Sequence, residues 1–215
     1  MIWPDTKLSH PDWIETLFPD GLDDPDTQIQ PASVDLTLGS EFLVMTMPAN
    51  PYRCSKRKVE RAYLGEIDPR HGVGSEVFER VVCGEGEAFL IQPGEFVLGT
   101  TREVIRIPNR LVAQIEGRSS YARLGVEIHL TAGFIDPGFK GKVTLEIVNN
   151  APRAILLWPG ERICQAVFFE MKCNARRPYG HPSRSSKYQN QPGVVSSRSH
   201  MDHQAEVSDH GSEGE

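Results

Sequence analysis

Residues 116–150 read EGRSSYARLGVEIHLTAGFIDPGFKGKVTLEIVNN, and this stretch decides the fold. Its runs VEIHLT (126–131) and VTLEIV (143–148) are rich in β-branched residues, and glycine and proline stand between them, which is typical of strands joined through turns. The stretch also contains Asp136 and Glu146, although Asp is depleted in strands and an ionised carboxylate is costly to bury without a partner. We therefore expect a β fold that keeps these carboxylates for a reason other than folding.

The same pattern extends over residues 30–173, where short apolar runs alternate with turn residues. The runs are SVDLTL, EFLVMTM, EAFLIQ, EFVLGTT, LVAQIE, VEIHLT, VTLEIV, AILLW and ICQAVFFEM, and the turn sequence PGE occurs twice. Many short strands separated by turns predict an antiparallel sandwich, jelly roll or barrel. Neither βα alternation nor a GxGxxG or GxxxxGKS/T motif occurs, which argues against Rossmann and P-loop folds.

The pattern changes at both ends of the chain. SHPDWIETLF (9–18) predicts a short helix with Ser9 as N-cap and Pro11 in the first turn. We expect one β-barrel domain over residues 1–175, including this helix. Residues 176–198 are basic and aromatic but lack core periodicity, which predicts a mobile arm that becomes ordered over a ligand and closes the active site. Residues 199–215 are predicted to form a disordered acidic tail.

Composition excludes several classes of function. A chain of 215 residues with a net charge of -6 and a pI near 5.7 is not suited to non-specific nucleic-acid binding. The start MIWPDTKLSH has no leader pattern and no run approaches a membrane span, so we expect a cytoplasmic protein that binds neither nucleic acid nor membrane. The four cysteines fall in no metal-binding spacing and are expected to be free thiols, and no HxxxH or HExxH motif supports zinc.

The segment GRSSYARLG (117–125) combines hydroxyl and guanidinium groups. Ser119 and Arg123 lie four residues apart, so one helical turn would place them on the same face. A turn that begins with Ser-Ser presents backbone N–H groups, and with Arg118 beside it the segment could cradle a phosphate. A capped surface turn with solvated arginines explains the segment equally well when it is taken alone.

Each of the two carboxylates also has a structural interpretation. Asp136 precedes Pro-Gly, as a residue that starts a turn often does. Glu146 falls on the strand face opposite to Leu145 and Ile147, where an exposed glutamate is common. It would indicate function only if that face lines a pocket.

Five segments together resemble the successive motifs of the dCTP deaminase family, a branch of the trimeric dUTPase fold. They are QPASVDLTLG, GRSSYARLG, TAGFIDPGFKGKVTLEIVN, LLWPGERICQ and SKYQNQPG, which stand in the family's order. The resemblance implies an all-β-dominated fold, a distorted β-barrel or jelly roll with a short N-terminal helix and a few small helices. It also implies a homotrimer with active sites at the subunit boundaries.

The resemblance implies roles for individual residues. Glu146 matches the glutamate that activates water for attack on C4 of cytosine, and Ser119 and Arg123 match residues that complete this deamination site. Asp136 matches the aspartate that accepts the deoxyribose 3′-hydroxyl, and Gln165 matches a glutamine near the nucleotide in some members. The other matching nucleotide-binding positions are Arg118 and Ser120 at the phosphates, Thr131, Ala132, and Tyr179, Lys187 and Gln191 of the arm.

The implied chemistry uses no protein-bound metal. Zinc-dependent nucleobase deaminases carry an HxE…PCxxC signature, which this sequence lacks. The resemblance therefore implies zinc-independent general base catalysis by Glu146. Mg²⁺ is expected on the phosphates of the substrate rather than in a protein cage.

Product and substrate stay open within the family. Gly133 and Phe134, together with Gln165, resemble the versions that cleave the triphosphate and release dUMP and pyrophosphate. Tyr121 departs from the usual Leu, and the arm sequence GHPSRSSKYQ contains less glycine than its counterpart. The alternatives are a deaminase that releases dUTP, a deaminase of 5-substituted dCTP, a plain dUTPase, whose strand usually has an aliphatic residue in place of Glu146, and a non-catalytic binder.

Overall fold

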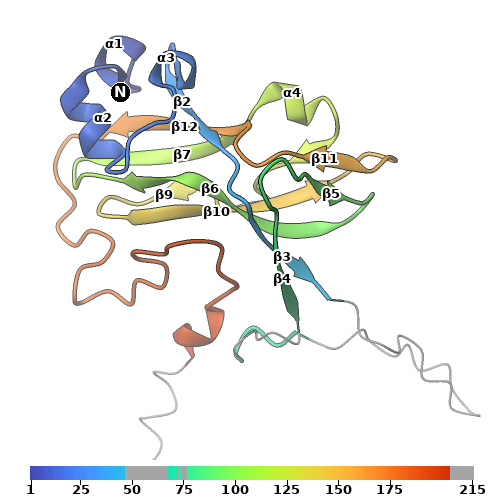
Figure 1. The fold of residues 1–215 in the computed structure, drawn as a ribbon. Coiled ribbons are helices and arrows are strands. Elements are labelled where there is room, and N and C mark those ends of the chain that lie inside the picture. The colour runs from blue at the N-terminus through green and yellow to red at the C-terminus, as the bar shows by residue number, and fades with distance from the viewer. Residues whose placement is uncertain (47–66, 72, 74–76, 204–215) are drawn as a thin grey trace, which may run out of the picture.

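The computed structural model describes residues 1–46, 67–71, 73 and 77–203. Its antiparallel strands form two five-stranded sheets and one two-stranded sheet, and the helices are short (Figure 1). Within the described residues the two large sheets do not merge into one cylinder. The all-β-dominated, distorted barrel or jelly roll expected from the sequence is thus confirmed.

Three short helices stand at the N-terminus and one interrupts the strands. The helices are α1 (Asp5–Leu8), α2 (Pro11–Leu17), α3 (Pro25–Gln28), α4 (Ser119–Ala122) and the 3-10 helix η1 (Ser199–Asp202). Helix α2 is the predicted one, but its N-cap is His10, so the prediction of Ser9 as N-cap is wrong. Ser9 instead closes α1, where its N–H donates to the carbonyl of Asp5 at 2.7 Å.

The first sheet has the order β1-β2-β12-β7-β9. Its strands are β1 (Ile29–Gln30), β2 (Ser33–Thr37), β7 (Leu111–Gly117), β9 (Phe134–Ile135) and β12 (Arg162–Glu170). On β7 the residues Leu111, Ala113 and Ile115 are buried while Gln114 and Glu116 are partly exposed, as expected for a sheet with one face on the core. This alternation leaves the polar face of the sheet outward.

The second large sheet has the order β4-β3-β6-β10-β8. Its strands are β3 (Glu41–Met45), β4 (Phe78–Val82), β6 (Phe96–Arg106), β8 (Val126–Glu127) and β10 (Lys140–Asn149), and the small sheet pairs β5 (Phe89–Ile91) with β11 (Ile155–Leu157). The chain crosses between the large sheets at Gly39, whose N–H donates to the carbonyl of Thr100 at 2.8 Å. A Cβ on Gly39 would lie 2.8 Å from Cγ2 of Thr100, so this crossing requires a glycine or a shift of its neighbour.

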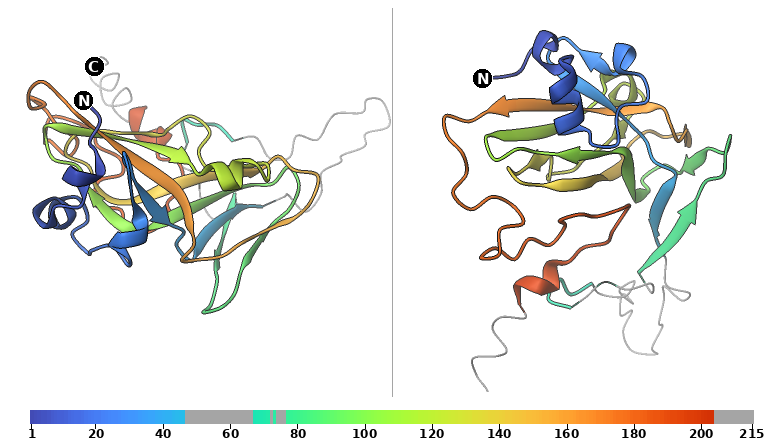
Figure 2. Two further views of the ribbon diagram at one scale, coloured as in Figure 1. Left: turned by 90° about the horizontal axis from the view of Figure 1, so that it is seen from above. Right: turned by 60° about the vertical axis from the view of Figure 1, so that its left-hand side comes forward.

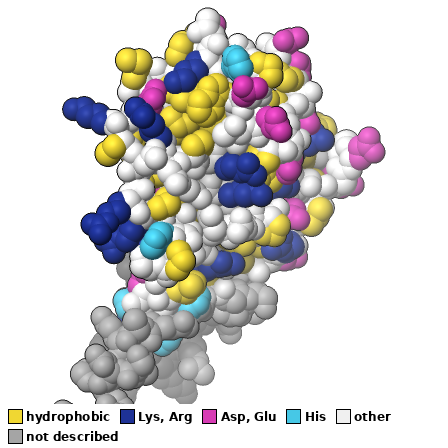
Figure 3. All heavy atoms as spheres, turned by 90° about the vertical axis from the view of Figure 1, so that its left-hand side faces the viewer, with side chains coloured by type: hydrophobic (Ala, Val, Ile, Leu, Met, Phe, Trp, Pro, Cys, Tyr) yellow, Lys and Arg dark blue, Asp and Glu magenta, His cyan; other side chains and the backbone are white. Residues whose placement is uncertain are grey.

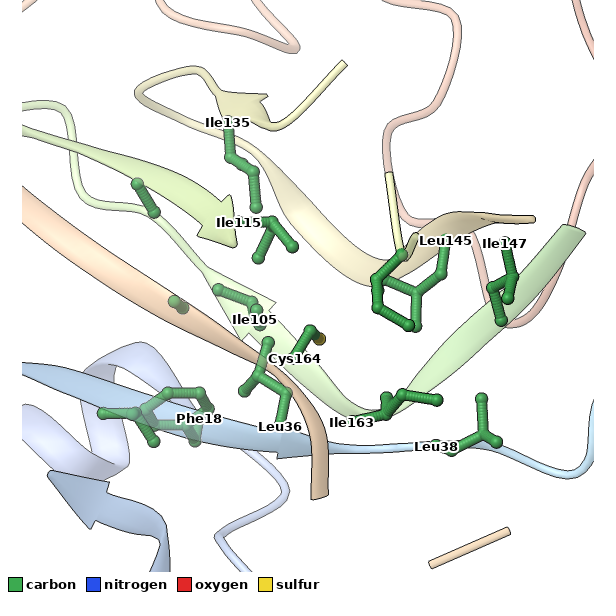
Figure 4. Packing of buried hydrophobic residues seen from close by; sticks show 14 of the residues in the cluster. Phe18, Leu36, Leu38, Ile105, Ile115, Ile135, Leu145, Ile147, Ile163 and Cys164 are labelled. Atoms are coloured by element: carbon green, nitrogen blue, oxygen red, sulfur yellow. The ribbon is translucent and has the colours of Figure 1, made fainter. Parts of the chain in front are cut away.

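The hydrophobic core fills the space between the sheets (Figure 4). The labelled core residues are Phe18, Leu36, Leu38, Ile105, Ile115, Ile135, Leu145, Ile147, Ile163 and Cys164. Each large apolar side chain contributes about 1.5–3 kcal/mol when it leaves water. The inward-facing apolar residues of the strands therefore stabilise the packing of the sheets. The outward-facing residues are not needed for this packing and can bind a ligand.

One predicted strand is mostly a loop. Of the run VEIHLT, only Val126–Glu127 forms a strand, β8. The chain then turns, because the N–H of Ile115 donates to the carbonyl of Gly133 at 2.7 Å and holds the following segment against β7. Conversely, β4 was not predicted, although Phe78–Val82 pairs along the whole length of β3.

The C-terminal arm follows the outer side of the β10 layer, opposite the N-terminal helices (Figures 1 and 2). Gln191 forms a parallel bridge with Gly141 of β10. Val194 is only 1% exposed and packs against Leu43 and Leu98, so the arm buries an apolar side chain although its sequence lacks core periodicity. The predicted tail begins with η1, and residues 204–215 lie outside the described residues.

Charges of both signs are interspersed on the face seen in Figure 3, without a continuous basic surface there. In the described part of the chain, none of the helices has the length and apolar character needed to cross a bilayer. Cys83, Cys164 and Cys173 are free thiols, as predicted, and Cys54 lies outside the described residues.

Candidate active site

Glu146 lies on β10 with its side chain on the face turned away from the core. Leu145 and Ile147 are fully buried, whereas Glu146 between them is partly exposed, so the predicted alternation is confirmed. Its Oε2 accepts hydrogen bonds from the backbone N–H groups of Leu130 at 3.0 Å and Thr131 at 3.4 Å. The loop that replaces the predicted strand thus supplies two fixed donors to the carboxylate.

The outer face of β10 lines a cleft of about 530 Å³, here called the Glu146 cleft. Most of its wall is apolar, including Phe78, Phe96 and Phe134, and its polar groups are few. Concave, mainly apolar sites with a small number of placed polar groups are typical of small-molecule binding. Glu146 therefore meets the condition set by the sequence, because its strand face does line a pocket.

Asp136 stands on the rim of the Glu146 cleft at the start of a turn. The N–H of Phe139 donates to the carbonyl of Asp136 at 3.2 Å, and Gly138 has a φ of 89°. A Cβ on Gly138 would also lie 2.5 Å from the carbonyl oxygen of Tyr179, so this turn needs glycine. The N–H of Tyr179 donates to the carbonyl of Pro137 at 2.7 Å. The turn interpretation of Asp136 is thus correct, and the same turn docks the arm beside its exposed side chain.

Tyr188 is a lining residue of the Glu146 cleft that sequence reasoning missed. Its N–H donates to the hydroxyl oxygen of Tyr179 at 2.8 Å. Burial is the main cause that raises the pKa of Tyr179, so this hydroxyl stays protonated at neutral pH. The position of Tyr188 directly after Lys187 in the SKYQ motif was the available signal.

Gln191 and Lys187 of the arm have different surroundings. Gln191 is buried and lines the Glu146 cleft, and its Nε2 donates to Thr144 Oγ1 at 3.2 Å and to the carbonyl of Lys142. Lys187 forms an ion pair with Asp202 of η1 and is not a lining residue of the cleft. The two predicted triphosphate contacts therefore do not converge in this conformation.

Helix α4 lines a second hollow of about 730 Å³, here called the Arg118 groove. Arg118 and Ser120 line it together with Arg162, the first residue of β12. Ser119 opens the helix and Arg123 ends it, and the N–H of Arg123 donates to the carbonyl of Ser119 at 3.1 Å. This bond closes one helical turn, so the helical turn expected for this segment is confirmed. The side chains of Ser119 and Arg123 are both exposed.

Tyr121 ties α4 to the turn that precedes β12. Its hydroxyl donates to Oε2 of Glu161 at 2.6 Å. Burial raises the pKa of Tyr121 and the bond to Glu161 raises it further, so the phenol stays a donor at neutral pH. The departure from the usual Leu thus adds a polar contact within the Arg118 groove.

A buried carboxylate, Asp35, lies behind the Arg118 groove on β2. Its Oδ2 is 3.1 Å from Nε of Arg118 and 3.3 Å from Nη1 of Arg162. Burial raises the pKa of Asp35, and the two guanidinium groups oppose this shift. Sequence reasoning did not assign Asp35, although a charged residue inside the apolar run SVDLTL was the available signal.

Gln165 lies on β12 opposite Asp35 of β2, and its Oε1 accepts a hydrogen bond from Ser33 Oγ at 2.9 Å. It lines neither the Glu146 cleft nor the Arg118 groove.

Among the described residues, no group of three or more His, Cys, Asp or Glu side chains is placed to hold a metal ion. Asp35 and Gln165 have protein partners across the strands: Asp35 pairs with Arg162, and Gln165 accepts the hydrogen bond from Ser33.

Ten of the twelve predicted site residues fall into two groups within one chain, and Gln165 and Lys187 belong to neither. The first group lines or contacts the Glu146 cleft and consists of Thr131, Ala132, Asp136, Glu146, Tyr179 and Gln191. The second belongs to α4 and its flanks and consists of Arg118, Ser119, Ser120 and Arg123. Neither of these two hollows is lined by residues of both groups.

The distorted barrel, the strand glutamate in a cleft and the short helix with serine and arginine are the features that the motif resemblance implied. Residues 15–171 match the family described as dCTP deaminase-like. The chain belongs to this family.

Two relatives carry names with different products. A protein from Methanobrevibacter smithii named "dCTP deaminase, dUMP-forming" is 47% identical over 178 residues, which cover 82% of this chain and 84% of the relative. A protein from Natronomonas pharaonis named "dCTP deaminase" is 46% identical over 178 residues with the same two coverages.

A solved structure supports the fold. The 2′-deoxycytidine 5′-triphosphate deaminase from Agrobacterium tumefaciens matches with a TM-score of 0.54 and 22% identity, over 78% of this chain and 47% of that chain. The match therefore spans about half of that longer protein. At this identity the likeness shows the fold alone.

Proposed function

We propose that this protein is a cytoplasmic enzyme that deaminates dCTP at C4 and releases dUMP, pyrophosphate and ammonia. The observation that carries the proposal is the partly exposed carboxylate of Glu146, held by two backbone N–H groups in a cleft lined by Ala132 and Asp136. Family membership supports the same reading. A plain dUTPase would not need a carboxylate at this position of the strand.

Glu146 serves as the general base. It takes a proton from water and passes it to N3 of cytosine while the water oxygen bonds to C4. It then takes the proton of the new hydroxyl group and passes it to the amino group, so that the C4–N4 bond breaks, the C4 carbonyl forms and ammonia leaves. The sum of the step is dCTP plus water giving dUTP plus ammonia. Because Oε2 is already held by Leu130 and Thr131, the other oxygen, Oε1, is available to the water. Positioned general bases typically accelerate such steps by about 10²- to 10⁴-fold.

A neighbouring copy completes the site. Glu146 and α4 face different hollows of the same chain, so we place α4 of one subunit at the Glu146 cleft of the next, within a homotrimer. In that arrangement Ser119 and Arg123 orient the water and the amino group. Arg118 and Ser120 meet the phosphates, since guanidinium groups and helix N–H donors suit phosphate oxygens.

The remaining assignments follow the substrate outward from its base. The backbone at Thr131 and Ala132 meets the edge of the base, and the exposed carboxylate of Asp136 accepts the 3′-hydroxyl. The nucleotide enters as its Mg²⁺ complex, with the ion on the phosphates. The arm residues Tyr179, Lys187 and Gln191 cover the triphosphate, for which Lys187 exchanges its present partner for phosphate, and Gln165 supports the site from β12.

In the second step, water attacks the α-phosphate of dUTP, the α–β phosphate bond breaks, and dUMP and pyrophosphate are released. We base our proposal of this step on Gly133 and its neighbour Phe134. A Cβ on Gly133 would lie 2.8 Å from the carbonyl oxygen of Ile115 and 3.0 Å from Cε1 of His129, so a larger residue would shift the loop that binds Glu146. Gly133 and Phe134 resemble the dUMP-forming members of the family, and the relative from Methanobrevibacter smithii is named as dUMP-forming, which supports dUMP over dUTP as the product.

Parallel incubations test the proposal. The protein is mixed with Mg²⁺ and either dCTP, dUTP or a 5-substituted dCTP, and the nucleotides are separated at successive times. We expect dUMP without accumulation of dUTP. Accumulation of dUTP would show that the protein deaminates dCTP without cleaving the triphosphate, and turnover of dUTP but not of dCTP would indicate a plain dUTPase. Faster turnover of a 5-substituted dCTP would make that nucleotide the preferred substrate. Unchanged nucleotides would refute an enzymatic role.

A further inference from the structure

A carboxylate outside the reacting centre calls for an explanation. Asp35 is 2% exposed on β2, the second strand of its sheet. Burying an ionised carboxylate is costly unless charges and hydrogen bonds compensate for lost water. Two guanidinium groups do so here, those of Arg118 and Arg162.

The cluster fixes the orientation of Arg118. Its Nε contacts Asp35 at 3.1 Å and its Nη1 donates to the backbone carbonyl of Arg162 at 2.9 Å. Within the described residues these contacts engage Nε and Nη1, which leaves Nη2 for a ligand. A planar guanidinium held at two points presents its remaining donors in one direction, which a flexible ammonium cannot do.

The held arginine is still reachable from solvent. The side chain of Arg118 is 29% exposed and that of Arg162 is 33% exposed, and both line the Arg118 groove, whereas Asp35 does not. The carboxylate therefore lies behind the two cations. One negative charge beside two positive ones leaves this three-residue cluster with one positive charge, while Asp23, Asp24 and Glu161 also line the groove.

We infer that Asp35 is a positioning residue for the triphosphate: it holds the guanidinium of Arg118, and secondarily that of Arg162, in the orientation that binds the nucleotide phosphates. This deepens the proposed function and rests on it. Asp35 itself contacts no substrate. Its contribution is the reduced freedom of Arg118 before the nucleotide arrives, which is preorganisation.

Replacing the carboxylate separates orientation from charge. Asp35→Asn makes the Arg118 groove more positive, so a purely electrostatic effect would tighten phosphate binding. If orientation governs binding, the variant instead weakens it, with a KM for dCTP raised about 10- to 100-fold, the range for one charge-assisted hydrogen bond. The kcat should change by less than about threefold, because Glu146 keeps its partners. The sign of the KM change thus decides between the two explanations.

Inorganic triphosphate is the second probe. Its inhibition constant, or its binding constant by calorimetry, should weaken in Asp35→Asn by the same factor as KM. Glu103→Gln is the matched control: Glu103 is also buried, at 5% exposure, and contacts Thr37 of the same strand β2, but it has no arginine partner among the described residues. This control should lose stability without weakening triphosphate binding.

A double-mutant cycle tests whether Asp35 acts through Arg118. In Arg118→Met, adding Asp35→Asn should raise KM by a much smaller factor than it does in wild type, because only Arg162 is left to be positioned. If Asp35→Asn does not fold, Arg118→Lys replaces it: this variant keeps the charge but lacks the fork, and its KM should rise about tenfold. A KM or triphosphate affinity in Asp35→Asn within twofold of wild type, or tighter, overturns the inference, as does an unchanged KM in Arg118→Lys.

Failure of the inference and failure of the proposed function give different results. A wild-type protein that leaves dCTP unchanged refutes the function, while its binding of inorganic triphosphate still tests the role of Asp35. A wild type that forms dUMP, together with an Asp35→Asn variant of normal KM, refutes only the positioning role.

Discussion

Val194 is a deeply buried apolar side chain of the arm, and replacing it with alanine measures how much its packing contributes to stability. Val194 is 1% exposed against Leu43 and Leu98, with Phe78 and Phe96 beside them. Val194→Ala removes two methyl groups at about 0.8 kcal/mol each and leaves a small cavity, a total of about 1.5–2.5 kcal/mol. For a chain of this length we expect the Tm to fall by about 3–10 °C.

The assay compares thermal unfolding of Val194→Ala with that of Val82→Ala, which makes the same chemical change at a side chain that is 60% exposed in the chain. The control should stay close to wild type. We also expect a higher KM for dCTP in Val194→Ala alone, because Tyr188 and Gln191 of the same arm line the Glu146 cleft. A Tm for Val194→Ala equal to that of the control would refute the packing of the arm.

Three further predictions concern charge, tail and metal. Burial raises the pKa of Glu103, so the folded chain holds this proton more tightly than the unfolded one, and the stability that Glu103 contributes falls as pH rises above about 4.3. The Tm deficit of Glu103→Gln relative to wild type should therefore shrink as pH rises, and a deficit that does not change with pH would contradict this. A chain ending at His200 loses Asp202, the partner of Lys187, yet should keep its fold and turnover without a higher KM for dCTP; loss of activity would show that the tail is required. Elemental analysis should find no stoichiometric zinc, and activity should survive a zinc-selective chelator but depend on Mg²⁺; one tightly bound zinc per chain would contradict the mechanism.

Strand periodicity predicted the fold wherever one face of a strand is buried. On β10 the alternation around Leu145 and Ile147 placed Glu146 on the outer face correctly, because a shift of one residue would have buried its charge. The run VEIHLT was misjudged, since its β propensity yields to the tertiary bond between Ile115 and Gly133 that turns the chain. Ser9 was misassigned for a similar reason, because a separate helical turn precedes α2.

Long-range contacts limit how much of the candidate site the sequence alone can predict. The neighbours of Glu146 include backbone donors at Leu130 and Thr131, which no side-chain pattern reveals. Asp35 meets Arg118 and Arg162 across strands far apart in sequence, so its burial could not be read locally. The packing of the arm likewise depends on few residues, too few to produce a periodic signal. The motif resemblance supplied the roles, and the topology shows which residues share a hollow.

The central claim is that Glu146 is the general base of dCTP deamination. Glu146→Gln keeps the side-chain size but cannot take a proton, and Glu79→Gln, on an exposed position of β4, is the matched control. The decisive measurement is ammonia release from dCTP and Mg²⁺ by both variants, with nucleotide binding measured alongside. The mechanism predicts that Glu146→Gln binds dCTP normally and loses turnover by at least about 10²-fold, while Glu79→Gln matches wild type. Substantial ammonia release by Glu146→Gln would contradict the account.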